Sequence, residues 1–205
     1  MNYDLLLSFV FATSALAFSP GPDNIFVLMQ SITNGKQYGL ATVAGLITGC
    51  IVHTTLVAFG VSAIIKANDH LFFTIKLFGA LYLLFLAYKV FKGDSRIEFS
   101  NTSAPKKSLL QLFKQGFIMN VLNPKVSIFF LAFFPGFLFS DSLSTVTQFY
   151  VLGFVFMAVS FVIFSLIAIL AGSISDYLKQ NNNVGVVLKW LQIVVFIAIA
   201  ILILL

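Results

Sequence analysis

Long apolar runs, separated by short polar breaks, are the main pattern along this chain. A transmembrane α-helix needs about 20 consecutive apolar residues, and every run is long enough to cross a bilayer. The runs cover residues 5–30, 40–65, 71–90, 109–139, 146–171 and 184–205. The pattern therefore predicts an all-α, polytopic membrane protein with six transmembrane helices.

Polar residues mark the expected connections between these runs. Asn34-Gly35-Lys36 is typical of a turn, and residues 66–70 separate the second run from the third. Residues 172–183 are interpreted as a polar turn before the last run. The fourth run is too long for one straight helix, so we expect interruptions at Asn123-Pro124 and at Pro135-Gly136.

One longer polar stretch, residues 92–107, divides the chain into two halves of similar size. The apolar runs leave no room for a separate soluble domain. We therefore expect a single transmembrane transporter domain over residues 1–205, built from half-repeats of about 1–92 and 105–205.

Each half carries a proline break in its first run, at Pro20 and Pro22 in one half and at Pro124 in the other. Three spans per half give the two halves opposite orientations in the membrane. Inverted repeats with discontinuous helices near the midplane are typical of secondary transporters. We therefore expect two inverted three-helix repeats, each with a proline-broken first helix.

The composition supports a chain that faces lipid. It is 60% hydrophobic and 9% charged, whereas a soluble domain carries about 25% charged residues. The net charge of +5 forms no basic face with aromatic contacts, so nucleic acid is not an expected partner. The expected partners are membrane lipid and a small-molecule substrate. Cys50 is the only cysteine, which rules out an intrachain disulfide and a cysteine metal cluster, and no cofactor is expected.

Basic residues predict the orientation in the membrane. By the positive-inside rule, the central loop that they flank is cytoplasmic. Counting outward from this loop places both termini outside, although Lys66 then falls in an outer turn. The basic residues around the loop are Lys89, Lys92, Arg96, Lys106, Lys107 and Lys114.

The segment Ser19-Pro20-Gly21-Pro22-Asp23-Asn24 interrupts the first run far from both of its ends. Proline lacks an N–H and leaves helix carbonyls without a partner, which is costly in hydrocarbon unless protein or trapped water satisfies them. Pro22 followed by Asp23 is typical of a helix start. We expect a second half-helix to begin here, and a simple proline kink capped by Asp23 is the alternative.

Asp23 is then a carboxylate at membrane depth, which costs about 2.5 to 3.5 kcal/mol at a helix centre. The carboxyl group must be neutral, paired or turned toward a watery cavity. We hypothesise that it exchanges a proton during a transport cycle.

The segment Asn120-Val121-Leu122-Asn123-Pro124-Lys125 is the counterpart in the second half. Asn123 is a candidate helix cap before Pro124, and Lys125 aligns with Asp23 when the two prolines are matched. A site with one anion and one cation suits a zwitterion, and Asn24 and Asn120 add hydrogen-bonding groups. The alternative for Lys125 is that its side chain reaches a membrane interface.

His53 shares one helix face with Ala41, Gly45 and Gly49, because these residues recur every four positions. Gly45 and Gly49 have the GxxxG spacing that allows close helix contact, within one subunit or between the subunits of a homodimer. His53 therefore faces protein. A buried histidine with one hydrogen bond is favoured over a proton relay, and a lone histidine predicts no metal site.

Several of these motifs closely resemble the LysE/RhtB family of bacterial amino-acid exporters, over essentially the whole chain. The resemblance implies efflux of amino acids or their derivatives across the bacterial inner (plasma) membrane by a multi-pass protein, in antiport with protons. The family often has arginine in the first short turn, where this chain has Lys36-Gln37, and members differ in substrate. The matching residues are Ser19 to Asp23, Gly35, Gly39, Gly45, Gly49, His53, Gly116, Asn120 and Asn123 to Lys125.

Other functions compete with amino-acid export. The chain has no Gly-Lys-Ser or Gly-Lys-Thr phosphate loop, so an ion or proton gradient is the expected source of energy. A divalent-cation transporter of a related superfamily would need several clustered ligands, whereas Asp23 and His53 are opposed by Lys125. An intramembrane lipid-modifying enzyme would need a nucleophile with a base, or a metal. A membrane assembly subunit without transport is a further alternative. We expect a transporter rather than an enzyme.

Overall fold

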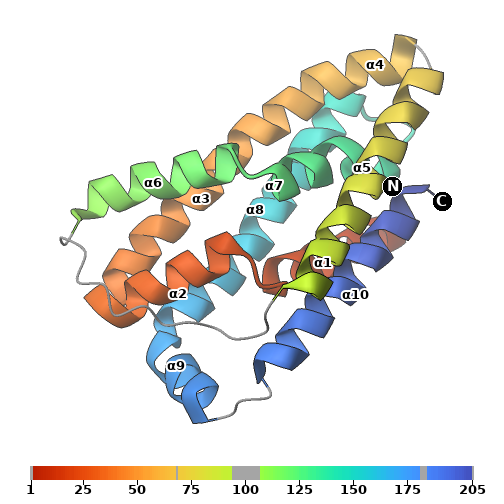
Figure 1. The fold of residues 1–205 in the computed structure, drawn as a ribbon. Helices are drawn as coiled ribbons and strands as arrows, with labels where there is room; N and C mark the ends of the chain where they lie inside the picture. The colour runs from red at the N-terminus through yellow and green to blue at the C-terminus, as the bar shows by residue number, and fades with distance from the viewer. Residues whose placement is uncertain (1, 68, 94–106, 181–183, 205) are drawn as a thin grey trace.

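A computed structural model describes residues 2–67, 69–93, 107–180 and 184–204, and these residues form helices and the turns between them (Figure 1). Two segments of π-helix, Val57–Val61 and Phe129–Phe133, and a 3-10 turn at Phe134–Phe137 lie between α-helices. The α-helices are α1 Tyr3–Phe18, α2 Pro22–Asn34, α3 Lys36–Leu56, α4 Ser62–Ala67, α5 Asp69–Lys92, α6 Leu109–Val121, α7 Pro124–Ile128, α8 Thr145–Ile169, α9 Ala171–Gln180 and α10 Val184–Leu204.

Four helical segments among the described residues are long and apolar enough to cross a membrane unbroken. They are Lys36–Ile64, His70–Lys92, Thr145–Ile169 and Val184–Leu204. Two further pairs are bent at the predicted breaks, α1 against α2 by 59° and α6 against the segment Pro124–Phe137 by 48°. The all-helical membrane fold is therefore confirmed, with up to six spans if each bent pair crosses once.

Both halves have the same order of elements, a bent pair followed by two long helices. The halves are interleaved, because α3 packs along α6 and α5 packs along α10 (Figure 1). The inverted relation of the two halves stays a prediction, and the central polar loop lies mostly outside the described residues.

Glycines bring α3 and α6 into backbone contact. A Cβ atom added to Gly45 would meet the carbonyl oxygen of Phe113, and one added to Gly116 would meet the carbonyl oxygen of Thr42. A Cβ atom on Gly49 would lie 2.9 Å from the Cβ atom of Asn120. The GxxxG stripe therefore packs within the subunit, against the helix that ends at the second break.

Phenylalanines form a packed core beyond the second break. The rings of Phe130 and Phe134 are stacked with centroids 4.1 Å apart, and Phe9 of α1 meets Phe134 edge-on at 5.0 Å. All three are fully buried. This cluster ties the π-helical segment after α7 to α1, so the far end of the second broken helix is held in place.

The predicted polar turn at 172–183 is wrong for most of its length, because α9 is a helix over Ala171–Gln180. Ala171 and Ser175 are buried one turn apart, while Gly172 and Asp176 are exposed. Such spacing is the pattern of a short amphipathic helix, which mean hydropathy does not reveal. The turn expected at Asn34-Gly35-Lys36 is confirmed, and Gly35 has a φ of 101°, which favours glycine.

Candidate functional site

The first break separates two helices rather than bending one. Ser19 is the C-cap of α1, Gly21 is the N-cap of α2 and Pro22 is its first residue. A kink would keep the helix running through Pro20, whereas residues 19–21 are not helical here. Pro124 likewise opens α7. The half-helix interpretation is therefore the one that the backbone follows at both breaks.

The carbonyl groups freed by the first break find new donors. In a continuous helix, Leu16 O would accept from residue 20, which is a proline without an N–H. The Nζ atom of Lys125 donates to Leu16 O at 3.3 Å and to Ser19 O at 3.2 Å instead. The Nδ2 atom of Asn24 donates to Ala17 O at 2.7 Å. These bonds meet the cost of an open helix end in hydrocarbon.

At the second break, His53 bonds to a backbone carbonyl group. In a continuous helix, Asn120 O would accept from residue 124, which is again a proline. It accepts from the backbone N–H of Asn123 at 3.0 Å instead, and His53 Nε2 lies 3.1 Å from the same oxygen. Since a carbonyl only accepts, Nε2 carries the proton in this bond. His53 is buried, and its ring lies 5.4 Å from that of Phe130. This geometry is that of the favoured packing interpretation, and a relay role stays a prediction.

Asn123 joins the two breaks. Its Oδ1 atom accepts from the backbone N–H of Lys125 at 3.0 Å, so it caps α7 as predicted. Its Nδ2 atom donates to Asp23 Oδ2 at 2.7 Å. One side chain therefore caps a helix of the second half and binds the carboxylate of the first half, 100 residues away in the chain.

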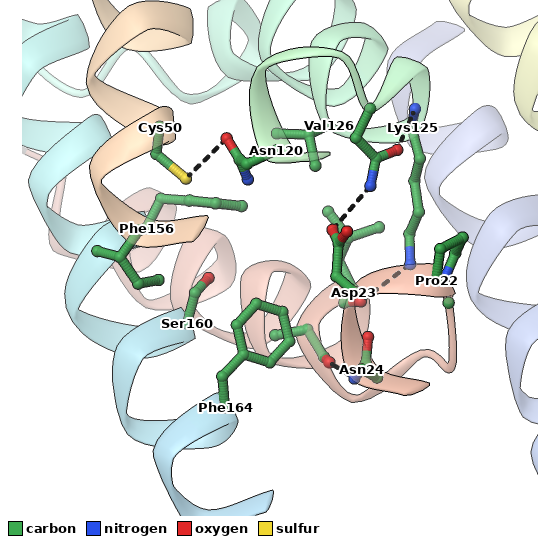
Figure 2. Close-up of a pocket in the computed structure, with 15 residues that line it drawn as sticks. Pro22, Asp23, Asn24, Cys50, Asn120, Lys125, Val126, Phe156, Ser160 and Phe164 are labelled. Atoms are coloured by element: carbon green, nitrogen blue, oxygen red, sulfur yellow. Dashed lines mark hydrogen bonds between the residues drawn. The ribbon is translucent and has the colours of Figure 1, made fainter. Parts of the chain in front are cut away.

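Asp23 and Lys125 line the same cavity, and each has its own hydrogen-bond partners (Figure 2). Asp23 is 7% exposed and is bound by the Asn123 amide, whereas the ammonium group of Lys125 bonds to carbonyl oxygens at the C-terminus of α1. A cation is favoured at that end of a helix by its dipole. The two charges thus stand near each other, and within the described residues their hydrogen bonds go elsewhere than to each other.

A cavity lies where the two breaks meet, between α1, α2, α3, α6, α7 and α8. The space inside it that water can reach is about 30 Å³, and one water needs about 10–15 Å³. It therefore has room for about two waters and is too small for an amino acid. Five of the six predicted substrate and coupling residues line it, namely Asp23, Asn24, Asn120, Asn123 and Lys125. His53 contacts it only through Asn120.

Sequence reasoning missed the opposite wall of the cavity. Phe156, Ser160 and Phe164 of α8 line it, and so does Cys50 of α3. Cys50 Sγ lies 3.7 Å from the Oδ1 atom of Asn120. The α8 residues recur every four positions, but a long apolar run offers several such stripes, so spacing alone did not single this one out.

Comparisons with known proteins agree on one family. Residues 14–205 match the family described as LysE type translocator. The homoserine/homoserine lactone efflux protein of Salmonella typhimurium is 29% identical over 179 residues, covering 87% of this chain and 86% of the relative. The leucine efflux protein of Enterobacter sp. is 26% identical over 178 residues, covering 87% and 84%. Over 141 residues, an uncharacterized membrane protein of Bacillus subtilis is 30% identical, covering 65% and 67%. No solved structure matches.

Proposed function

We propose that this chain, which belongs to the LysE type translocator family, is a secondary-active exporter of amino acids or amino-acid derivatives that runs on the proton gradient. The family is one of transporters, so the chain is a transporter rather than an enzyme. Relatives named for the efflux of homoserine and of leucine support amino-acid export across the inner membrane. The cavity where the two helix breaks meet is the observation that carries the proposal.

The groups around the cavity suit a zwitterion. The carboxylate of Asp23 binds the substrate ammonium group, and the ammonium group of Lys125 binds the substrate carboxylate. The N-terminus of α2 also favours an anion, because its first N–H groups have no side-chain cap. The Asn123 amide donates a hydrogen bond to one oxygen of Asp23. We propose that this bond breaks when the substrate binds.

The cavity must widen for transport, since it is too small for an amino acid as it stands. The bonds that cross between the halves, from Asn123 to Asp23 and from Lys125 to Leu16 O and Ser19 O, are the ones that change. Movement of one half against the other around a central site is how repeat-built transporters alternate their access.

Asp23 offers a simple route to proton coupling. A proton and a substrate ammonium group compete for its carboxylate, because a neutral carboxyl group no longer attracts a cation. Proton entry on one side then favours substrate release, which is antiport. A lone intramembrane carboxylate that lines a cavity is a usual place for such a step.

Transport by the purified chain in proteoliposomes tests this function. With an imposed proton gradient and a panel of labelled amino acids, we expect the wild-type chain to move at least one of them and the Asp23→Asn variant to lose gradient-driven transport. Asp4→Asn is the matched control. It makes the same change in charge, and Asp4 is exposed at the start of α1. Full gradient-driven transport by the Asp23→Asn variant would remove the coupling role.

A further inference from the structure

A larger groove lies beside the first break, separate from the cavity between the two breaks. Water can reach about 430 Å³ of space in it, against about 30 Å³ in the cavity. The groove is bordered by α2, by the end of α8, by α9 and by the start of α10. In Figure 1, α9 and the start of α10 lie at the lower end of the molecule.

Polar groups are few in this groove. Nine of the twelve residues that line it are apolar, and the other three are Asn24, Ser173 and Tyr177. The Nδ2 atom of Asn24 already donates to Ala17 O at 2.7 Å. A peptide segment in the groove would leave most of its backbone N–H and C=O groups without partners, which is costly. The lining therefore suits a ligand without hydrogen-bonding groups.

The groove lies at membrane depth. Ile167 belongs to the last turn of the span Thr145–Ile169, and Val184 and Leu188 belong to the first turns of the span Val184–Leu204. The groove also reaches Pro20, in the break of the first bent pair. At this depth the protein is surrounded by lipid hydrocarbon rather than by water.

The first half of α10 lacks a protein cover on the side of the groove. The helix begins at Val184, but its first buried residue is Ile193, and residues 184–192 are all half-buried or exposed. Val184 and Leu188 are half-buried and line the groove. Hydrocarbon from the bilayer would bury these apolar side chains against α2 and α9.

A second copy of this chain fits the groove less well than a lipid does. A helix is about 10–12 Å across with its side chains, so a space of about 430 Å³ would hold about one turn of it. An acyl chain is thinner and flexible, and each methylene group that it buries favours binding.

We propose that this groove binds an acyl chain of a membrane phospholipid, which enters from the leaflet on the side of α9. The acyl chain packs between α2 and the start of α10, and it extends toward the first break. Asn24 lines both the groove and the cavity, so the bound lipid also supports the wall that the two spaces share. This inference does not depend on the proposed function.

Native mass spectrometry of the full chain in a mild detergent tests the site. With palmitoyl-oleoyl-phosphatidylglycerol added, we expect the wild type to retain one lipid per chain. Ser173→Trp fills the groove from α9 and should weaken this binding about tenfold, the effect of excluding about two methylene groups. Gly172→Trp is the matched control and should retain the lipid, because Gly172 is exposed on the same helix and does not line the groove.

A short-chain lipid separates recognition of the acyl chain from recognition of the head group. Dihexanoyl-phosphatidylglycerol has the same head group, but it has few methylene groups to bury. We expect it not to displace the long-chain lipid at equal concentration. Displacement by the short-chain lipid would mean that the head group is bound instead, which would overturn the proposal.

A measurement on the wild type covers the case in which Ser173→Trp does not fold. A phospholipid with a diazirine group in its acyl chain, supplied at one molecule per protein, should crosslink mainly to Ile25, Ile174 and Leu188 in the groove. Phe78 and Phe85 of α5 are the comparison, because both are exposed to lipid elsewhere on the protein. Equal labelling of the two sets would show only general contact with lipid and would contradict a specific site.

Three results of the mass measurement would overturn the proposal. The first is a wild type that retains no lipid, and the second is equal retention by Ser173→Trp and Gly172→Trp. The third is a dimer that Ser173→Trp disrupts and Gly172→Trp does not, since a second copy of the chain would then occupy the groove.

Discussion

The Nζ atom of Lys125 donates to Leu16 O and Ser19 O, which the first break leaves without a helical partner. His53 Nε2 bonds to Asn120 O, which cannot accept from Pro124 and also accepts a turn bond from the backbone N–H of Asn123. At the scale of the residue, both breaks thus follow one rule. The carbonyl four residues before Pro20 or Pro124 is bound by a nitrogen-bearing side chain from elsewhere in the fold.

Replacing Lys125 should destabilise the protein. Lys125→Met removes both hydrogen bonds, and each buried carbonyl left unpaired costs about 1–3 kcal/mol. Thermal unfolding of the purified variant in detergent would measure the loss. Lys189→Met is the control, because Lys189 also donates to a carbonyl, that of Gly93 at 2.7 Å, but at an exposed position where water replaces it. Equal stability of the two variants would argue against this role.

The crossing of α3 and α6 is the element that holds the second break in place. Gly45 and Gly116 let the two backbones touch, and Asn120 follows Gly116 by one turn on α6. The position of the Asn120 side chain in the cavity, and of its carbonyl beside His53, thus depends on how closely the helices approach.

A methyl group at Gly45 should therefore be costly. Its Cβ atom would meet the backbone oxygen of Phe113, which cannot rotate away, and overpacking of this kind costs about 1–3 kcal/mol. We expect Gly45→Ala to lower the unfolding temperature in detergent. Gly172→Ala makes the same change where no atom lies within 4 Å and should leave stability unchanged or slightly higher. The contact is unimportant if both variants unfold like the wild type.

At the scale of the whole molecule, the bent pairs decide how often the chain crosses the membrane. Within the described ranges, four helical segments are long and apolar enough to span the membrane unbroken, and the pairs add two more only if each passes from one side to the other. The basic residues beside the central loop, among them Lys89, Lys92, Lys107 and Lys114 in the described range, favour a cytoplasmic loop. Six crossings with this orientation are what we propose.

Cysteine labelling tests the crossing directly. In a Cys50→Ala background, a membrane-impermeant maleimide should label Lys107→Cys from the cytoplasmic side and Asp141→Cys from the outside. The two positions flank the bent pair of α6 and α7, and both are exposed. Asp4→Cys and Lys36→Cys test α1 and α2 in the same way. Labelling of both members of a pair from one side would show a re-entrant loop instead of a span.

Much of this architecture could be predicted from local patterns in the sequence. The lengths of the apolar runs predict the spans, because a bilayer has a set thickness. Pro22 and Pro124 mark where α2 and α7 begin, because a proline has no N–H to give to the preceding turn. Asn123 could be named as a cap for the same kind of reason, since a cap bonds to its own helix.

Contacts between distant residues were decided only by the tertiary structure. Whether the amide of Asn123 reaches Asp23, whether Lys125 binds α1 carbonyls, and which face of α8 turns Ser160 to the cavity all depend on how helices far apart in sequence are packed. The apolar runs, the breaks and the residue types near them could be read from the sequence, because these follow from neighbours along the chain. The shared cavity follows from close packing between the two halves, which no local pattern encodes.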